Sequence, residues 1–347
     1  MEKTQYVKDL KDKDAVHSPF LVKFSAIATG KNGRPYMNLV LCDKTGEVEA
    51  RIWEDVNQYA GQVVRDALVL VEGKCQSYQG RKQVVVGRIQ VLREDTLNLK
   101  DYIPESSVDP EDLYRKLLGR IEEMQDPYYR ALAESVLRDD QEIIDGFKKA
   151  PAAKSLHHAY RGGLLEHVVS VTRLLDLVSA HYGKWLDRDL MFLGGIFHDI
   201  GKIWELSYDR VTEYTTEGKL VGHLVMGVEL VTEKIRELES VAGRLPGPFP
   251  QDKALLIKHV ILAHHGQLEY GSPKRPKCLE AWVVHMMDDM DSKVNSIAMF
   301  MEQDQTQGRW TALNRQHERF FYKSDWVGEA AAAAAAAQAS GGATSGH

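Results

Sequence analysis

Cysteine is scarce in this chain of 347 residues, and long apolar runs are missing from it. The three cysteines, Cys42, Cys75 and Cys278, are odd in number and widely separated. That pattern excludes a disulfide framework and a zinc ribbon. No stretch approaches the roughly 20 apolar residues of a transmembrane helix, and the N-terminus lacks the apolar segment of a secretory signal. We therefore expect a cytoplasmic protein.

An overall basic excess is also missing. Lys and Arg number 44 against 50 Asp and Glu, which gives a formal net charge of -6 with neutral histidines. Binding to nucleic acid would therefore need a local basic patch. Hydrophobic residues make up 44% and charged residues 27%, the balance of a globular protein with a substantial core. The length is sufficient for two domains.

The chain from about Phe20 to Leu92 has the pattern of a β domain. Five short runs rich in Val, Ile and aromatic residues are separated by turn residues: FLVKFSAIAT, PYMNLVLCD, EVEARIW, ALVLVEGKCQSY and KQVVVGRIQVL. A non-strand segment, EDVNQYAGQVV, follows the third run. This layout is typical of a five-stranded OB-type barrel, which we expect over residues 1–95. A small β-barrel that binds no ligand is the alternative.

A polar segment with Pro and Ser follows at residues 96–112 and predicts a linker. Beyond it the apolar residues repeat with helical period, and no strand pattern of similar quality is present. We expect an all-α domain over 113–326 and a disordered Ala/Gly/Ser-rich tail over 327–347. The predicted helices are Leu113–Met124, Pro127–Leu137, Gln141–Lys149, Gly163–His181, Arg188–His198, Leu224–Leu238, Gln251–His264 and Leu279–Met301.

Histidines gather in the helical part, between His157 and His285. Residues that can bind a metal occur in five separate helical segments: His167, His198, Asp199, His223, His264, His265 and Asp288. Taken singly, each could be a core residue, a capping residue or a solvated one. Together they favour a metal centre, because buried imidazoles and carboxylates need partners and one divalent cation partners several of them at once.

The residue types narrow the choice of ion. Imidazole and carboxylate without cysteine suit Mn, Fe, Co, Ni or Zn, whereas Mg and Ca prefer oxygen ligands alone. A carboxylate can bridge two ions, which a histidine cannot. Asp199 lies centrally in the set, so we expect it to bridge two divalent transition-metal ions.

The order His167, His198-Asp199 and Asp288 resembles the signature of the HD-domain phosphohydrolases, which are all-α metal enzymes that cleave phosphate esters. The additional histidines resemble the subgroup with two ions. The resemblance implies one ion held by His167, His198, Asp199 and Asp288, and a second held by Asp199, His223, His264 and His265. Within MDDM, the family pattern aligns Asp288 rather than Asp289 with the last ligand, although a slip by one residue stays open.

An OB-type barrel before an HD domain is similar, more particularly, to the YhaM-type 3′→5′ exoribonucleases of bacteria. HHAYRGGLLEH, FHDIGK, AHHGQLEYGSPKRP and MMDDMDSK carry that likeness. It implies hydrolysis of single-stranded RNA, and in some members single-stranded DNA, by metal-activated water, with Mn²⁺ or a similar ion and a homo-oligomeric assembly. Asp199 and Lys202 are the candidate catalytic residues. Lys202 is placed to contact a phosphate or the attacking water, and a solvated lysine at a helix end is the alternative.

Nucleic-acid contacts are expected from two parts of the chain. The barrel interleaves aromatic residues with Lys23, Lys31, Arg34, Arg51, Lys74, Arg81, Lys82 and Arg88. Single-strand binding uses this mixture, with cations for phosphates and rings for bases, and Tyr36 and Trp53 are the candidate stacking residues. Near the metal ligands, Arg161 and the loop with Lys274 and Arg275 are candidates for the backbone. Core packing of the rings and plain solvation of the cations are the alternatives.

Two other functions remain open at this stage. HD proteins include nucleotide and cyclic-nucleotide phosphohydrolases, although the GYP feature of the cyclic-dinucleotide enzymes is missing after HHG. A catalytically silent nucleic-acid-binding protein is the second alternative, and the complete set of ligand positions disfavours it.

Overall fold

The computed structural model describes residues 3–30, 33–78, 81–93, 97–106, 108–154, 158–304, 306 and 308–324. The tail predicted over 327–347 lies outside these residues, as do Lys31 and His157. The chain divides into two compact units, Met1–Asp288 and Asp289–His347. The domain limits drawn above from composition stay a prediction.

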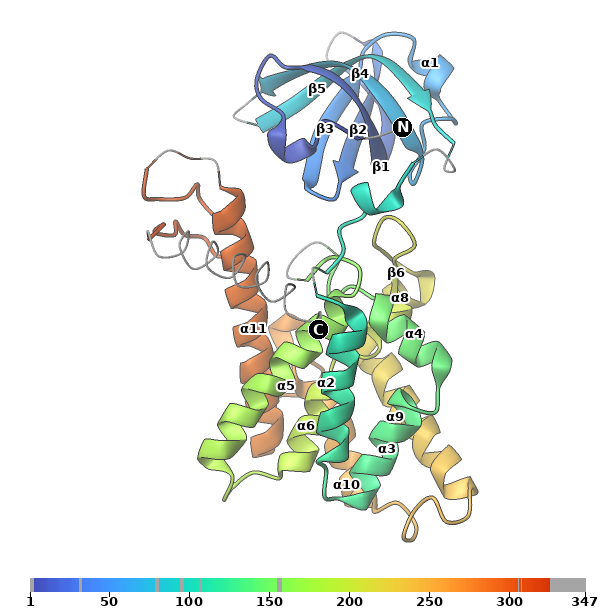
Figure 1. Cartoon of the computed structure of the whole chain (residues 1–347), viewed down its shortest axis with the longest axis vertical. Helices are drawn as coiled ribbons and strands as arrows, with labels where there is room; N and C mark the ends of the chain where they lie inside the picture. Colours follow the sequence, from blue (N-terminus) through green and yellow to red (C-terminus); the bar gives the residue numbers. More distant parts are fainter. Residues whose placement is uncertain are drawn as a thin grey trace, which may run out of the picture. The chain divides into compact units, whose positions relative to one another are not determined.

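The N-terminal part forms a closed five-stranded barrel (Figure 1). Its strands follow the order β1-β2-β3-β5-β4, with β3 and β5 parallel and the other pairs antiparallel. The strands are β1 (Ala15–Thr29), β2 (Pro35–Asp43), β3 (Gly46–Ile52), β4 (Leu68–Tyr78) and β5 (Arg81–Val91), with a short helix α1 (Val56–Tyr59) after β3. This arrangement confirms the predicted OB barrel and its non-strand insertion.

The first strand begins five residues before the predicted start at Phe20. Its first half, Ala15–Leu21, pairs with β4, and its second half pairs with β2. Pro19 and the polar residues His17 and Ser18 hide this half from a pattern search, because they interrupt the apolar alternation of a strand. Pairing with a distant strand therefore decides the structure here.

Alternation along the strands separates the barrel core from its outer surface. Met37 and Leu39 on β2, with Ala50 and Ile52 on β3, are buried in the interior. The side chains between them point the other way. This alternation brings residues of β2 and the end of β3 to the outer surface, where ligands of OB folds bind.

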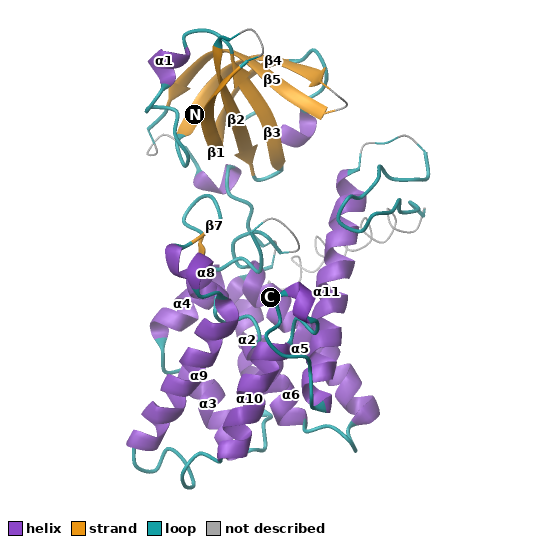
Figure 2. Cartoon of the chain, turned by 180° about the vertical axis from the view of Figure 1, so that it is seen from behind, coloured by secondary structure: helices purple, strands orange, loops and turns teal. Residues whose placement is uncertain are grey.

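The named elements after the barrel are helices, apart from one short strand pair (Figure 2). The helices are α2 (Pro110–Glu122), α3 (Pro127–Leu137), α4 (Gln141–Lys149), α5 (Gly163–Tyr182), α6 (Arg188–Phe197), α7 (Lys202–Glu205), α8 (Thr216–Leu220), α9 (His223–Ser240), α10 (Gln251–Ala263) and α11 (Leu279–Gln303). The predicted helical domain is confirmed. The sequence analysis missed α7, α8 and the pair β6 (Leu206–Ser207) and β7 (Glu213–Tyr214), which are too short to show a period.

Local signals explain why several helices start where predicted. Asp126 and Asp140 cap α3 and α4 by accepting hydrogen bonds from backbone N–H groups of the first turn. Apolar faces of α2, α3, α4, α5, α6, α9 and α10 then meet in one continuous core, which includes Phe147, Phe192 and Phe197. This core holds the helix ends that carry the candidate ligands.

The unit that begins at Asp289 contains the second part of α11 and a segment with two antiparallel bridges, Trp310 with Tyr322 and Asn314 with Arg319. Within the described residues of the whole chain, no helix combines the length and the apolar character that crossing a membrane requires.

Candidate metal centre and nucleic-acid interface

The seven candidate ligands come from the ends or inner faces of five helices. His167 lies in the second turn of α5, and His198 caps the C-terminus of α6, with Asp199 next to it. His223 is the first residue of α9, His264 caps α10 and is followed by His265, and Asp288 lies in α11. His167, His198 and Asp199 are almost completely buried. Residues up to 121 positions apart in sequence, as His167 and Asp288 are, thus meet at one place.

A glycine allows two of these segments to approach each other. A Cβ atom at Gly201 would lie 2.1 Å from the carbonyl oxygen of His223, which is far inside contact distance. Any larger residue would therefore push the start of α9 away from the turn that carries Asp199. This close approach explains the glycine of HDIGK.

Asp199 lies between two groups of histidines. Its Oδ2 atom is 3.5 Å from Nε2 of His198 and 3.7 Å from Nε2 of His167. Its Oδ1 atom is 3.5 Å from Nε2 of His223 and 3.4 Å from Nε2 of His264. Ring nitrogens of His223, His264 and His265 also lie within 4.8 Å of one another. One carboxylate thus presents one oxygen to each group.

Asp288 completes the first group. Its Oδ1 atom lies 3.2 Å from Nε2 of His167 and 3.8 Å from Nε2 of His198. The neighbouring Asp289 instead pairs with Lys293 one turn along the helix, with 2.7 Å between Asp289 Oδ2 and Lys293 Nζ. The geometry therefore favours Asp288 as the carboxylate of this group.

Four of the histidines are held through Nδ1. Each Nδ1 lies within hydrogen-bonding distance of an oxygen atom of the chain: Gly195 O for His198 (2.9 Å), Glu205 Oε1 for His223 (2.9 Å), Ile261 O for His264 (2.8 Å) and Tyr270 O for His265 (3.0 Å). Since these oxygens accept, Nδ1–H must donate, and the Nε2 atom of the neutral ring carries a lone pair. Metal-binding histidines are commonly oriented in this way.

The donor set fits a divalent cation. Asp199 Oδ1 and His223 Nε2 are buried and have no hydrogen-bond partner. Because Nδ1 of His223 already donates to Glu205, its Nε2 lone pair faces the lone pairs of the Asp199 carboxylate. Two acceptors facing each other in a buried place are unfavourable unless a cation lies between them. A divalent metal is therefore the group that this site suits.

The charges of the site point the same way. Burial raises the pKa of Asp199, but the positive charge of Lys202 and the interactions with His198 and His264 outweigh it and hold the pKa well below its usual value. For Asp288, burial is again outweighed, chiefly by His167, and the pKa is lowered. Burial lowers the pKa of His264 to about 3. Two carboxylates thus stay charged and the imidazole stays neutral, the states that bind metal.

Lys202 lies directly against the central carboxylate. Its Nζ atom donates to Asp199 Oδ2 at 2.6 Å, and the lysine side chain is only 12% exposed. Burial lowers the pKa of Lys202, but the charge of Asp199 raises it by more, so the net shift is upward. The alternative of a solvated lysine at a helix end does not describe this side chain.

The candidate stacking residues of the barrel lie together on its outer surface. The rings of Tyr36 and Trp53 are stacked, with centroids 4.9 Å apart, and Trp53 is 46% exposed. The guanidinium of Arg51 lies 5.4 Å from the Tyr36 centroid and 5.8 Å from those of Trp53 and Tyr78. Its buried Nε atom has no hydrogen-bond partner. A cation among accessible rings is an arrangement that suits single-stranded nucleic acid.

The other three candidates for nucleic-acid contacts, Arg161, Lys274 and Arg275, lie on two separate segments of the helical part. Arg161 lines a cavity of about 320 Å³ together with Lys148 and Lys149, at the N-terminal side of α5. Lys274 and Arg275 are exposed on the loop after His265, which Ser272 attaches to the end of α10 through a 2.8 Å hydrogen bond to Leu262 O. The structure thus places these basic residues on segments next to candidate ligands in sequence.

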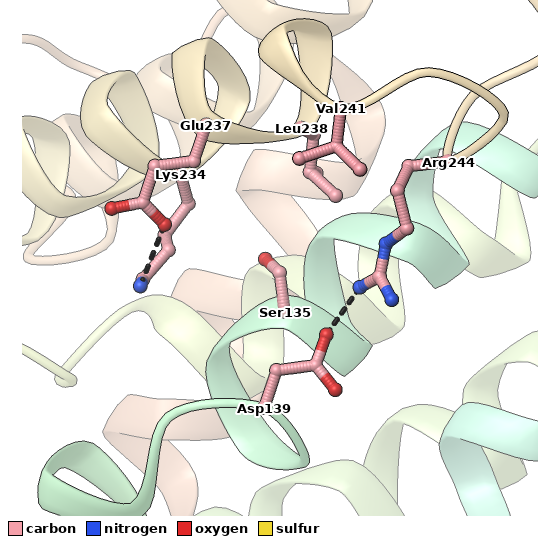
Figure 3. A pocket seen from close by; sticks show the side chains of 7 residues that line it. All are labelled: Ser135, Asp139, Lys234, Glu237, Leu238, Val241 and Arg244. Carbon is pink, nitrogen blue, oxygen red and sulfur yellow. Dashed lines mark hydrogen bonds and ion pairs between the residues drawn. The ribbon is translucent and has the colours of Figure 1, made fainter.

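A second cavity in the helical part has a volume of about 250 Å³ and is lined by two acidic and two basic side chains (Figure 3). The charged side chains that line it are paired with one another. Lys234 Nζ lies 2.9 Å from Glu237, and Arg244 pairs with Asp139 (Figure 3). Lys234 Nζ also lies 2.9 Å from Asp140. Since these charges are already compensated, the cavity is explained as packing between α3 and α9.

Family comparisons agree with the two parts of the chain. The HD domain family matches residues 164–293, and the OB-fold nucleic acid binding domain family matches residues 22–92. The 3'-5' exoribonuclease YhaM of Halalkalibacterium halodurans is 33% identical over 314 residues, which cover 90% of this chain and 94% of that protein. The chain belongs to the YhaM family. The resemblance noted from the sequence motifs is confirmed.

Two solved structures match about a quarter of this YhaM-family chain. One is the second OB-fold domain of replication protein A from Methanococcus maripaludis, at 16% identity, 26% of this chain, 95% of that chain and a TM-score of 0.22. The mitochondrial single-stranded DNA binding protein Rim1 of S. cerevisiae matches at 16% identity, 24% of this chain, 97% of that chain and a TM-score of 0.21. The strand order of the barrel and the family match over residues 22–92 assign it as an OB fold.

Sequence reasoning did not single out Glu205, although this residue holds His223. Its carboxylate accepts from both the backbone N–H (3.0 Å) and the Nδ1–H of His223. Burial raises the pKa of Glu205, but these hydrogen bonds outweigh it and the pKa is lowered. A glutamate 18 residues before its partner gives no local signal, so only the fold reveals this contact.

Proposed function

We propose that this protein is a metal-dependent 3′→5′ exoribonuclease that hydrolyses the phosphodiester bonds of single-stranded RNA, with single-stranded DNA as a second substrate. The relative named YhaM supports the reaction and its direction. The observation that carries the proposal is the position of Asp199, whose two oxygens each face a separate group of histidines. Such a carboxylate suits a pair of cations that act on one phosphate.

The proposed cofactor is a pair of divalent transition-metal ions, with Mn²⁺ as the working ion and Fe, Co, Ni or Zn as substitutes. One ion would be held by His167, His198, Asp199 and Asp288, and the second by Asp199, His223, His264 and His265. The donor set of imidazoles and carboxylates, without a thiolate, supports this choice. The 3.2 to 3.8 Å separations of the donor atoms in the first group also support it.

Divalent ions held by these residues would supply a water of lowered pKa and positive charge opposite the phosphoryl oxygens. Asp199 would help to hold both ions. Lys202 neutralises one oxygen of this carboxylate and can turn towards a substrate phosphate, since its ammonium group rotates on a flexible stem. Tyr36 and Trp53 of the barrel stack on bases, while Arg161, Lys274 and Arg275 contact the phosphate backbone.

The proposal is tested with a 5′-labelled RNA oligomer and Mn²⁺. Removal of nucleotides from the 3′ end produces a ladder of progressively shorter labelled products, whereas removal from the 5′ end releases a labelled mononucleotide at once. The Asp199→Ala variant should abolish the ladder and leave RNA binding through the barrel intact. Activity on free nucleotides or cyclic nucleotides alone would replace the proposal with the nucleotide phosphohydrolase alternative.

Metal analysis distinguishes the proposed enzyme from a catalytically silent nucleic-acid-binding protein. A catalytically silent nucleic-acid-binding protein would bind RNA but hold less than one transition-metal ion per chain, and Mn²⁺ would not restore hydrolysis. Loss of RNA binding and hydrolysis together in Asp199→Ala would contradict the separate roles of barrel and metal centre.

We also propose that the chain forms a homo-oligomer. Helix α11 exposes apolar side chains at intervals of three or four residues, which places them on one face: Leu279, Trp282, Met286, Met290 and Val294. A second copy of the chain would cover this stripe. Light scattering on Met286→Glu tests the idea, because a charge there should lower the mass of the assembly.

A cytoplasmic location is supported by the three free cysteines.

A further inference from the structure

His158 is a buried histidine that neither the sequence analysis nor the mechanism above uses. It is only 4% exposed, and its backbone has a φ of +48°, in the left-handed region that residues other than glycine rarely adopt. Such a conformation persists only where the surroundings hold it, and it occurs preferentially at functional sites. The position of His158 therefore calls for an explanation beyond core packing.

The backbone of His158 is held against the start of α5. A Cβ atom at Gly163 would lie 2.0 Å from the carbonyl oxygen of His158, so only glycine leaves room for this contact. The same carbonyl accepts a hydrogen bond from Ala152 N–H at 3.1 Å. Since His167 lies one turn further along α5, this packing holds His158 in a defined place relative to a candidate ligand.

The ring of His158 is oriented by a relay of two residues. Nδ1 lies 2.7 Å from the hydroxyl oxygen of Tyr160, and that hydroxyl donates to Glu166 Oε2 at 2.9 Å. A carboxylate only accepts, so the Tyr160 proton goes to Glu166 and the Tyr160 oxygen accepts from Nδ1–H of His158. Ser106 Oγ, 2.7 Å from the same Oε2, steadies the carboxylate. The neutral ring thus carries its lone pair on Nε2.

Three of the candidate ligand histidines are oriented through Nδ1 in the same way. His198, His223 and His264 also donate through Nδ1 and turn Nε2 towards the centre. The ring of His158 lies 5.7 Å from that of His167, close to the 5.3 Å between His167 and His198. A ring nitrogen of His158 lies within 4.8 Å of one of His167. The row of imidazoles therefore continues by one ring beyond His167.

We propose that His158 is a further imidazole ligand of the centre, binding a divalent cation on the His167 side, and that Tyr160 and Glu166 are its positioning residues. This extends the metal centre of the proposed function and does not depend on RNA being the substrate. A ligand role would account for the unusual backbone of His158, because strained backbone conformations cluster at sites that bind ligands. It also accounts for the glutamate that directly precedes His167, since Glu166 fixes the relay.

The test measures metal binding in the full chain without substrate. Mn²⁺ titration by calorimetry on His158→Gln should show an affinity at least about tenfold lower than that of the unchanged protein. Tyr160→Phe keeps the ring and removes the hydroxyl, and it should lower the affinity in the same direction by a smaller factor. His181→Gln, on the exposed C-terminal part of α5, is the matched control and should bind Mn²⁺ unchanged.

A spectroscopic readout separates ligation from packing. The nitrogen modulation in the electron spin echo of bound Mn²⁺ reports directly coordinated imidazoles, and it should decrease in His158→Gln and persist in His181→Gln. Equal affinity and unchanged modulation in His158→Gln would overturn the inference. Absence of tight Mn²⁺ binding by the unchanged protein would instead contradict the metal centre of the proposed function, so the two failures are distinguishable. Circular dichroism of each variant verifies that it is folded.

Discussion

Lys202 Nζ lies 2.6 Å from Asp199 Oδ2, one helical turn along the chain, and both side chains are almost fully buried. The lysine therefore occupies the side of the carboxylate that faces His167 and His198, where the ligand set implies a cation. Lys202 compensates a carboxylate charge inside the helical core. The pair thus links stability to metal binding.

Replacing Lys202 by Met should separate these two effects. The metal-free variant should be destabilised by about 3 kcal/mol, because breaking a buried ion pair leaves one charge uncompensated. Its Mn²⁺ affinity should stay equal or rise, since a competing cation has been removed from Asp199. Its hydrolysis of RNA should fall by about a hundredfold if the ammonium contacts the phosphate in the transition state. Chemical denaturation, calorimetry and a single-turnover assay measure the three effects. A parallel fall of stability and Mn²⁺ affinity would show that Lys202 supports the site only as packing.

Asp288 and Asp289 offer a matched pair of adjacent variants. Asp288→Asn should weaken Mn²⁺ binding at least about tenfold, because Oδ1 lies 3.2 Å from Nε2 of His167 and its charge belongs to the donor set. Asp289→Asn removes only an exposed helix pair with Lys293, which contributes about 0.3–0.5 kcal/mol, and should leave the affinity unchanged. The reverse result would assign the ligand role to Asp289.

Trp53→Ala tests the barrel independently of the metal centre. Loss of one stacked base contact costs roughly 1–3 kcal/mol, so the affinity for a single-stranded RNA oligomer should fall by about fivefold to 150-fold. The KM for RNA should rise while Mn²⁺ affinity does not change. Trp185→Ala is the control, because Trp185 is also exposed (58%) and a cation also lies over its ring, Lys184 in place of the Arg51 at Trp53. Fluorescence anisotropy with a labelled oligomer gives the affinities, and equal losses in both variants would exclude a specific platform.

The stability of the metal-free protein should fall on acidification. Burial holds the pKa of His264 at about 3, below the ordinary 6.5, so the unfolded chain binds a proton between these values and the folded chain does not. Stability from this group is therefore full above about pH 6.5 and is lost as the pH falls towards 3, at up to about 1.4 kcal/mol per pH unit. Denaturation at pH 7, 6 and 5 measures the slope. His264→Gln should flatten it, and an unchanged slope would contradict the role of this ring.

Residues with a local signature were accurately predicted. The starts of α3 and α4 follow from the N-caps Asp126 and Asp140, which act within one turn of the chain. The candidate ligands could be found because histidines and aspartates at the ends of apolar helices have no other common cause. Glu205 and His158 could not be assigned, because their roles depend on contacts that no sequence period reports.

The amino-acid sequence alone predicts the barrel, the helical domain and the set of residues that can bind metal. It can do so because alternation, helical period and residue chemistry are properties of short segments. Only the tertiary structure decides that the two oxygens of Asp199 face different histidines and that Lys202 contacts one of them. It also decides which of two adjacent aspartates reaches His167, since a shift of one position turns a helical side chain by about 100°. Such choices depend on how distant helices pack, and packing is determined by the whole core at once.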